Sequence, residues 1–389
     1  MFARRTGWNL KKNAFTLALE RHQEGGRELL DLTVSNPTRA GLAAENVEIL
    51  SALAKPESLD YDPQPRGLLA AREAVASYYR GLEAEASPEQ IILTTSTSEA
   101  YSFLFRLLCD PEDEVLIPSP SYPLFEFLAD IQDVRLVPYE LVYDHGWQID
   151  FHSIKKTISP RTRAVVLVNP NNPTGSFVKA AEREELNGLC RQHELALMVD
   201  EVFFDFNLLG EKFDSFATNN SALTFTMSGL SKIAGLPQMK VAWVATTGPR
   251  ELAREALDRL EVIADTYLSM NAPIQHAIPE LLASRAEFQR KLKKRLRENL
   301  GELDRQLAEQ KLCSRLQVEG SWYATLRVPV TRTDEELAIE LLEKRDVLVH
   351  PGHFFNCQAD GYLILSLMTP ERTFGEGVKR LLVHLSEIT

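Results

Sequence analysis

One lysine in an apolar stretch is the first candidate for chemistry. Residues 227–244 read MSGLSKIAGLPQMKVAWV and carry only two charges, those of Lys232 and Lys240. Desolvation disfavours the charged form of a lysine, so its pKa falls in such surroundings. A lysine that is partly neutral near pH 7 attacks carbonyl groups and can form a Schiff base. The ordinary alternative is a solvated lysine at a strand end, so Lys232 needs support from the rest of the chain.

A second candidate is a run of hydroxyl side chains after the apolar segment 91–95. Ser96, Thr97 and Ser98 stand where a helix is expected to begin. Free N–H groups and hydroxyls at a helix start suit a phosphate. Serine and threonine also cap helices routinely, so this signal is weak by itself.

Two further polar groups follow apolar segments. The string NPNNPTG, residues 169–175, follows the apolar run 164–168 and holds amide donors on a loop stiffened by proline. Asp200 and Glu201 follow the apolar run 195–199. An acid at a strand end usually caps a helix or meets solvent, whereas the asparagine string is too dense for a plain turn.

These groups all follow segments that are expected to be buried strands. Continuous apolar strands predict a mostly parallel sheet covered by helices on both faces, with functional groups beyond the carboxyl ends of its strands. Strands are expected at 29–34, 91–95, 114–118, 134–139, 164–168, 195–199, 222–227, 241–245, 322–328, 347–350 and 362–367. Helices are expected at 12–24, 68–80, 97–108, 122–131, 179–194, 280–311, 333–345 and 374–386.

Length and charge set the class of protein. A chain of 389 residues accommodates a large domain, residues 51–279, and a smaller α+β domain from residues 1–50 and 280–389. The net charge of −12 argues against nucleic acid or an anionic membrane as the main partner. No apolar run approaches the roughly 20 residues of a membrane span. The four cysteines lack metal-ligand spacing and no secretory signal is evident, which predicts free thiols, no metal site and a cytoplasmic protein.

The four polar groups together suit one ligand, because pyridoxal 5′-phosphate offers a phosphate, a polar ring edge, a positive nitrogen and a carbonyl. The segments YDPQPRG, TTSTSEA, PSYPLF, NPNNPTG, MVDEVFF, SGLSK and HPGHFF stand in the order found in class I/II aminotransferases. The chain resembles that family over nearly its whole length. The resemblance implies an α/β protein of fold type I, with a mostly parallel central sheet between helices and a smaller α+β domain from both termini.

The resemblance also implies roles for individual residues. Lys232 would bind the cofactor as a Schiff base and move a proton at the substrate Cα, and Asp200 would pair with the pyridine nitrogen. Asn172 would donate to the ring hydroxyl oxygen, and Tyr122 would stack on the ring. The phosphate ligands implied are Ser96, Thr97, Ser98, Ser231 and Lys240. Tyr61 would reach the phosphate of the neighbouring subunit, in a homodimer with shared active sites.

Two departures from the family pattern concern the cofactor. Phe203 stands where the family usually has a tyrosine that donates to the ring oxygen. With one donor fewer, the pKa of the Lys232 Schiff base is expected to be higher than in typical members. Lys240 stands where an arginine usually binds the phosphate, and it offers a point charge instead of a planar fork.

A third departure concerns the substrate. Ile364 occupies the position at which the family has an arginine that binds the substrate α-carboxylate. An aliphatic side chain cannot pair with a carboxylate, so either another cation acts or the substrate lacks an ordinary carboxylate. Substrate contacts are therefore expected from Ser35, Asn172 and the Ile364 position. The candidates for a replacement cation are Arg39, Arg66 and His353.

Three functions follow from this set of residues. The first is an aminotransferase that moves an amino group between an amino donor and a keto acid by ping-pong half-reactions, in a biosynthetic process. The second is a lyase or decarboxylase that uses the same cofactor and fold. The third is a non-catalytic cofactor-binding module of a transcription regulator. The negative net charge disfavours the third function, and so does the presence together of Lys232, Asp200 and Asn172.

Overall fold

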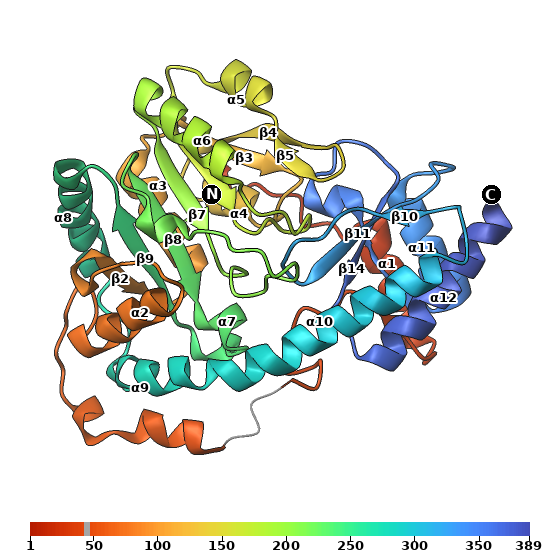
Figure 1. Cartoon of the computed structure of the whole chain (residues 1–389), viewed down its shortest axis with the longest axis horizontal. Coiled ribbons are helices and arrows are strands. Elements are labelled where there is room, and N and C mark those ends of the chain that lie inside the picture. Colours follow the sequence, from red (N-terminus) through yellow and green to blue (C-terminus); the bar gives the residue numbers. More distant parts are fainter. Residues whose placement is uncertain (43–46) are drawn as a thin grey trace.

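A mixed eight-stranded sheet forms the centre of the computed structural model, which describes residues 1–42 and 47–389 (Figure 1). Its strand order is β2-β9-β8-β7-β6-β3-β4-β5. The strands are β2 (Ile91–Thr94), β3 (Glu114–Ser119), β4 (Arg135–Tyr143), β5 (Trp147–Ile149), β6 (Thr162–Val168), β7 (Ala196–Asp200), β8 (Thr224–Gly229) and β9 (Ala242–Thr247). The run from β8 through β7, β6 and β3 to β4 is parallel, while β9 is antiparallel to both of its neighbours, β2 and β8. The predicted mostly parallel sheet is confirmed.

Helices cover both faces of this sheet, so successive residues of the strands β3, β7, β8 and β9 are all buried. On β3, Ile117 packs with Phe105 on one face, while Leu116 packs with Leu186 on the other. The first layer holds α3 (Thr97–Leu108), α4 (Phe125–Asp130) and α8 (Arg250–Thr266). The second holds α2 (Leu69–Gly81), α5 (Phe151–Thr157), α6 (Ala180–His193), α7 (Leu230–Ile233) and α9 (Ala272–Ala283).

A smaller sheet lies at the other end of the molecule, with strand order β10-β11-β14-β13. Its strands are β10 (Ser314–Arg315), β11 (Tyr323–Arg327), β13 (His350–Pro351) and β14 (Tyr362–Ser366). The short strands β1 (Leu30–Asp31) and β12 (Val347–Leu348) pair with each other in parallel. The surrounding helices are α1 (Ala14–Glu24), α10 (Arg285–Leu307), α11 (Asp334–Arg345) and α12 (Glu371–Ile388). We call the four-stranded sheet the C-terminal sheet.

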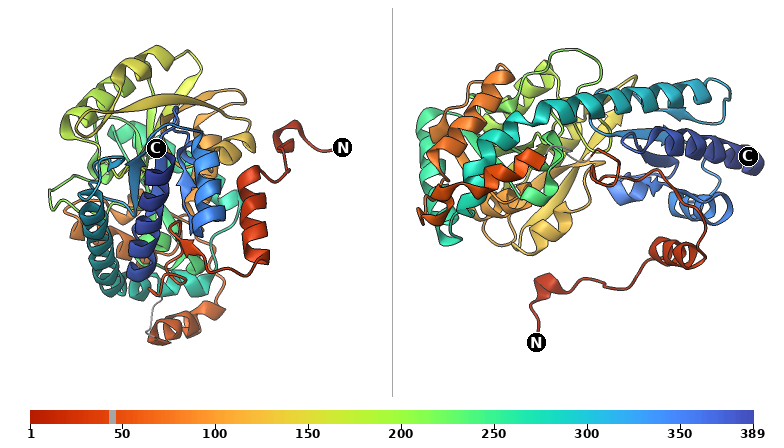
Figure 2. Two further views of the ribbon diagram at one scale, coloured as in Figure 1. Left: turned by 90° about the vertical axis from the view of Figure 1, so that its right-hand side faces the viewer. Right: turned by 90° about the horizontal axis from the view of Figure 1, so that it is seen from below.

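One apolar core joins the N-terminal and C-terminal segments. It includes Phe15 and Leu32 from the N-terminal segment, and Leu341 and Leu381 from the C-terminal segment. From the middle of the chain it includes Phe203 and a few other residues. On this basis we propose the division into residues 51–279 and 1–50 with 280–389; residues 43–46 lie outside the described part of the chain. In Figure 2 the segment before α1 runs out from this end of the molecule and along the outside of the large sheet's layers.

The prediction of one helix over residues 280–311 was wrong. Two helices, α9 and α10, meet at Ser284, whose hydroxyl donates to the Leu281 carbonyl at 2.8 Å. The helix α10 spans the gap between the two sheets (Figure 1). It buries Leu292, Leu296 and Leu303 along one stripe, and it carries the predicted i,i+4 ion pairs on its exposed face.

Two other predicted elements are shorter than expected. The helix expected at 122–131 begins only at Phe125, because Tyr122 precedes Pro123 and the residue before a proline avoids helical dihedrals. The strand expected at 29–34 is limited to Leu30–Asp31. All four cysteines are free thiols. Among the described residues, no helix combines the length and apolarity of a membrane span, and no cluster of three or more His, Cys, Asp or Glu could hold a metal.

Candidate active site

The topology brings the predicted polar groups to one edge of the large sheet. The strands β2, β8, β7, β6 and β3 all point the same way, so the loops after them meet at that edge. Asp200 ends β7, and its carbonyl accepts from the Asn169 amide at 2.8 Å in the loop after β6. The helix α7, which carries Lys232, begins directly after β8.

Lys232 is held by a close contact between α7 and β9. The Leu230 amide donates to the Val241 carbonyl at 3.0 Å. Gly229 permits this approach, since a Cβ there would lie 2.7 Å from the same Val241 oxygen. The Lys232 amino group lies 5.0 Å from the centre of the Trp322 ring and 5.7 Å from that of Phe203. Burial among these rings lowers the pKa of Lys232, and the nearby Asp200 charge only partly opposes this shift.

Asp200 is the acid that faces the lysine. Its side chain is buried, with 9% of the residue exposed. Burial raises the pKa of Asp200 to about 6, against the opposing effects of the Val202 amide, the Lys232 charge and the Tyr101 hydroxyl. The Val202 amide donates to Oδ1 at 3.1 Å, and Tyr101 donates to Oδ2 at the long distance of 3.5 Å. Asp200 is therefore weakly satisfied and suited to a further positive partner.

Of the three asparagines in the 169–175 loop, Asn172 is the one left for a ligand. Asn169 accepts from the Val178 amide at 3.0 Å and donates to Glu201 at 3.2 Å. The amide oxygen of Asn171 accepts from Thr174. The Asn172 amide oxygen, in contrast, is buried without a hydrogen-bond partner. An unpaired buried amide costs free energy unless a ligand or water completes it.

The predicted phosphate ligands line the same edge with accessible side chains. Ser96 caps α3 by accepting from the Glu99 amide at 3.1 Å, and Thr97 and Ser98 form the first turn behind it. Ser231, on α7, is partly exposed, and Lys240 is exposed in the left-handed region at the start of β9. The capping role of Ser96 is the ordinary one, but it leaves the N-terminus of α3 open toward the site.

Tyr122 and Tyr61 lie in different surroundings. Tyr122 is 39% exposed in the loop after β3, and burial together with the Asp200 charge raises its pKa. Tyr61 is 80% exposed and lines a separate cavity with Asn271 and Gln275. Within the described chain, Tyr61 therefore does not join the Lys232 site.

The substrate positions lie toward the C-terminal sheet. Ile364 is fully buried on β14, and Ser35 is exposed in the segment that Ser366 anchors by donating to the Val34 carbonyl. Arg66 is engaged elsewhere, because its guanidinium pairs with Glu261 at 2.6 Å. The other two candidate cations, Arg39 and His353, are exposed.

Several contacts at this site escaped the sequence analysis. The side chains concerned are Tyr101, Thr325, Trp322, Tyr323 and His350. Tyr101 belongs to a predicted helix and stands four residues after Thr97. This spacing weakly predicts that the two side chains lie on the same face of that helix. The others come from the C-terminal sheet, and no local pattern connects them to Lys232.

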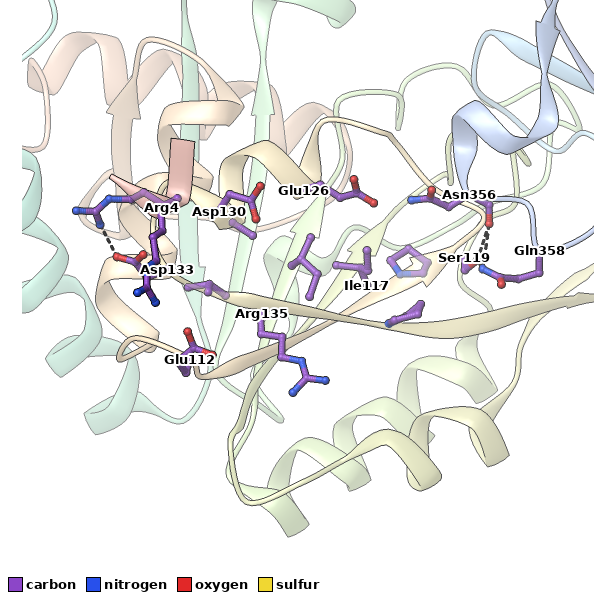
Figure 3. Close-up of a pocket in the computed structure, with 16 residues that line it drawn as sticks. Arg4, Glu112, Ile117, Ser119, Glu126, Asp130, Asp133, Arg135, Asn356 and Gln358 are labelled. Atoms are coloured by element: carbon purple, nitrogen blue, oxygen red, sulfur yellow. Dashed lines mark hydrogen bonds and ion pairs between the residues drawn. The ribbon is translucent and has the colours of Figure 1, made fainter. Parts of the chain in front are cut away.

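A cavity with a volume of about 650 Å³ lies next to β3 and β4 of the large sheet (Figure 3). It is enclosed by the N-terminal segment, α4, β3 and β4, and the loop around Asn356. At one end the Ser119 hydroxyl donates to the Asn356 carbonyl at 2.7 Å, and Gln358 donates to the same hydroxyl at 2.9 Å. Arg4, Asp130 and Asp133 give its wall charges of both signs. None of the residues predicted for the Lys232 site lines it.

Solved structures define the class of fold. An alanine aminotransferase from Pyrococcus furiosus superposes with a TM-score of 0.89 at 23% identity, covering 100% of both chains. An aspartate aminotransferase from Thermus thermophilus gives a TM-score of 0.85 at 24% identity, covering 99% of each chain. The architecture is therefore that of the fold type I aminotransferases, as predicted.

Sequence comparisons show the family. The model for aminotransferase class I and II matches residues 27–381. The alanine aminotransferase of Mycobacterium tuberculosis is 30% identical over 368 residues, which cover 92% of this chain and 85% of that protein. A glutamate-pyruvate aminotransferase from Haemophilus influenzae is 26% identical, covering 94% and 93%. The chain belongs to the class I and II aminotransferases, which depend on pyridoxal phosphate, and it is a transaminase.

Proposed function

We propose that this transaminase binds pyridoxal 5′-phosphate at Lys232 and transfers an amino group between an amino donor and a keto acid by a ping-pong mechanism. The observation that carries the proposal is the half-buried Lys232, whose amino group lies among the Trp322 and Phe203 rings near the weakly satisfied Asp200 carboxylate at the carboxyl edge of the sheet. The Asn172 side chain, whose oxygen is unpaired and whose nitrogen is a donor, and the N-terminus of α3 at the same sheet edge complete a set of groups that fits this cofactor.

Each group has a distinct task in this proposal. When bound, pyridoxal phosphate supplies a ring that accepts electrons from the substrate Cα. Lys232, with its lowered pKa, serves as the nucleophile that holds the cofactor and as the base that moves the proton at Cα. Asp200 keeps the ring nitrogen protonated, while Asn172 donates to the ring oxygen. The rings of Phe203 and Trp322 exclude water from the amino group.

The phosphate and the oligomer belong to the same proposal. Ser96, Thr97, Ser98, Ser231 and Lys240 bind the phosphate at the start of α3 and α7. Tyr61 is exposed and remote from Lys232 in its own chain, as a side chain that serves a neighbouring subunit would be. We therefore propose a homodimer with shared active sites, acting in the cytoplasm.

The substrate carboxylate site is atypical in this proposal. The relatives are named for alanine and for glutamate with pyruvate, whose carboxylates need a cation. Ile364 is aliphatic and fully buried, and Arg66 is already paired with Glu261. The part of the site that faces the C-terminal sheet is thus poorly suited to an ordinary α-carboxylate.

The type of reaction is tested by adding an amino donor alone to the holoenzyme. A transaminase converts its cofactor stoichiometrically to the aminated form, which is read as loss of the visible absorbance band. A lyase or decarboxylase would restore the band and release product continuously. Continuous turnover without a keto acid would therefore contradict transamination.

Removing the Tyr101 hydroxyl is expected to shift the pH dependence of cofactor binding. This hydroxyl helps to lower the pKa of Asp200, which is about 6 without the cofactor. Below that pKa Asp200 is neutral and cannot pair with the ring nitrogen, so cofactor affinity should fall as the pH falls through about 6. In Tyr101→Phe the pKa rises further, and the loss should begin at a higher pH. Cofactor titrations of the apoenzyme between pH 5 and 8, chosen to bracket the Asp200 pKa, measure the midpoint.

The matched control for this experiment is Tyr139→Phe. Tyr139 is equally buried, but its hydroxyl donates to the Val166 carbonyl at 2.9 Å and does not contact Asp200. This variant is expected to keep the wild-type midpoint. A midpoint that is the same in both variants and in the wild type would show that Tyr101 does not act on Asp200.

Restoring a tyrosine at Phe203 is expected to lower the pKa of the Lys232-bound chromophore. The Phe203 ring lies 5.7 Å from the Lys232 amino group and offers no hydrogen-bond donor to the cofactor ring oxygen. A donor at that oxygen stabilises its anionic form, so the neighbouring nitrogen gives up its proton at lower pH. The measurement is a spectroscopic pH titration of Phe203→Tyr. Phe204→Tyr is the control, because the Phe204 ring packs against Phe177. An unchanged or higher pKa in Phe203→Tyr would contradict this account.

A further inference from the structure

The two faces of the C-terminal sheet differ sharply in chemistry. Alternate residues of adjacent strands share a face. One face is aliphatic and holds Ala324, Leu326, Leu363 and Leu365. On β11, β13 and β14 the other face, which we call the polar face, holds Tyr323, Thr325, Arg327, His350, Tyr362, Ile364 and Ser366. On it Ile364 lies between Thr325 on one neighbouring strand and His350 on the other.

The polar face is turned toward the Lys232 site. The Tyr323 ring lies 6.4 Å from that of Phe203, which is the ring beside the Lys232 amino group. Tyr323 also lies 6.2 Å from Phe355, and His350 lies 5.7 Å from the same ring. A continuous set of aromatic contacts thus joins the lysine to His350.

Two buried polar atoms on this face lack partners. Thr325 is 3% exposed, and its hydroxyl has no hydrogen-bond partner. The Nδ1 atom of His350 is likewise buried and unpaired. Buried polar groups are nearly always hydrogen-bonded, because an unmet one costs free energy. The two residues flank Ile364, one on β11 and one on β13, and each offers an uncharged hydrogen-bonding atom to a ligand.

The polar face carries no fixed positive charge between Thr325 and His350, because Arg327 on the same face is exposed and its guanidinium lies 5.6 Å from the centre of the Tyr143 ring. Burial lowers the pKa of His350 to about 4, although the Asp31 charge opposes the shift, so its imidazole is neutral near pH 7. The two side chains that flank Ile364, Thr325 and His350, are therefore both uncharged at that pH. An ionised carboxylate placed here would be desolvated without a counter-charge.

We propose that Thr325 and His350 recognise an uncharged hydrogen-bonding group, such as an amide or a hydroxyl, on the end of the substrate that faces the C-terminal sheet. The substrate class is then an amine bearing such a group in place of a free α-carboxylate. This inference rests on the proposed aminotransferase function, since it assigns specificity within that site.

The first test compares matched pairs of donors with the holoenzyme: L-alanine with L-alaninamide and with L-alaninol, and L-phenylalanine with its amide. The rate of the donor half-reaction is followed by loss of the visible cofactor band. The amide or alcohol is expected to react at least about ten-fold faster than the matching acid, the factor that one hydrogen bond provides. A faster acid in every pair overturns the inference and leaves transamination intact. If no donor reacts, the proposed function fails, and this inference fails with it.

The second test is Thr325→Val, which removes the hydroxyl and keeps the shape. Because the hydroxyl has no partner in the protein, thermal stability should be unchanged or slightly higher, while KM for the amide should rise about ten-fold. The control is Thr247→Val, since Thr247 is also buried with an unpaired hydroxyl but lies at the opposite end of β9 from the site. Equal KM values in the two variants would overturn the assignment of Thr325.

Discussion

Lys232→Ala protein is expected to turn over at least about 10⁴-fold more slowly than the wild type, because it loses both the nucleophile and the base. Burial beside Trp322 and Phe203 lowers the pKa of the amino group, which favours the neutral, nucleophilic form of the wild-type lysine. The variant should also lack the covalent cofactor and its visible band. Steady-state rates and absorbance spectra of purified protein measure both effects.

Two controls separate chemistry from folding. Lys232→Arg keeps a positive charge near Asp200 but cannot form the covalent bond, so it should be as inactive as the alanine variant. Lys212→Ala removes an exposed lysine that pairs with Glu83, and it should retain wild-type turnover. Substantial activity in Lys232→Arg would contradict the assigned role of the amine.

Asp200→Asn is expected to lower kcat by about 10²–10³-fold, the cost of removing one preorganised electrostatic contact. A neutral amide cannot hold the proton on the ring nitrogen, so the ring becomes a weaker electron acceptor. The carboxylate is buried on the lysine side of the sheet edge, with the Val202 amide and the Tyr101 hydroxyl as its hydrogen-bond donors. The measurement is kcat with the best donor at saturation, on protein reconstituted with cofactor.

The neighbouring acid is a matched control for this prediction. Glu201 is 1% exposed and accepts from the Ser215 hydroxyl at 2.6 Å, the Phe216 amide at 2.9 Å and Asn169 at 3.2 Å. Glu201→Gln should therefore lower thermal stability and leave kcat nearly unchanged. If Glu201→Gln lost as much turnover as Asp200→Asn, the assignment of Asp200 as the partner of the ring nitrogen would be contradicted.

The central sheet and its edge were largely predictable from the sequence. The apolar segments 164–168 and 195–199 lie within or one residue from β6 and β7, and the helix predicted at 97–108 coincides with α3. Continuous burial and clear helix starts are local signals. Because the carboxyl ends of parallel strands meet, placing Lys232, Asp200 and Asn172 on strand ends was enough to bring them to one edge.

The rest of the site depends on contacts that local sequence does not encode. Trp322 reaches Lys232 from 90 positions away along the chain, and Tyr101 meets Asp200 across the sheet edge. Nor does any periodicity reveal that Thr325 and His350 lie on either side of Ile364, since that depends on the register of three strands. The break between α9 and α10 at Ser284 was missed because the residues on both sides of it, Leu-Leu-Ala before and Arg-Ala-Glu after, all favour helix.

The most direct test of the account is borohydride reduction of the cofactor-loaded enzyme, followed by peptide mapping with mass spectrometry. Reduction makes the bond between the lysine and the cofactor permanent. The account predicts a single cofactor-modified peptide that contains residues 227–240, with the added mass on Lys232. Its absence from the Lys232→Arg protein is part of the same prediction. A modified peptide elsewhere, a modification on Lys240 instead, or no modification after loading with the cofactor would contradict the central claim.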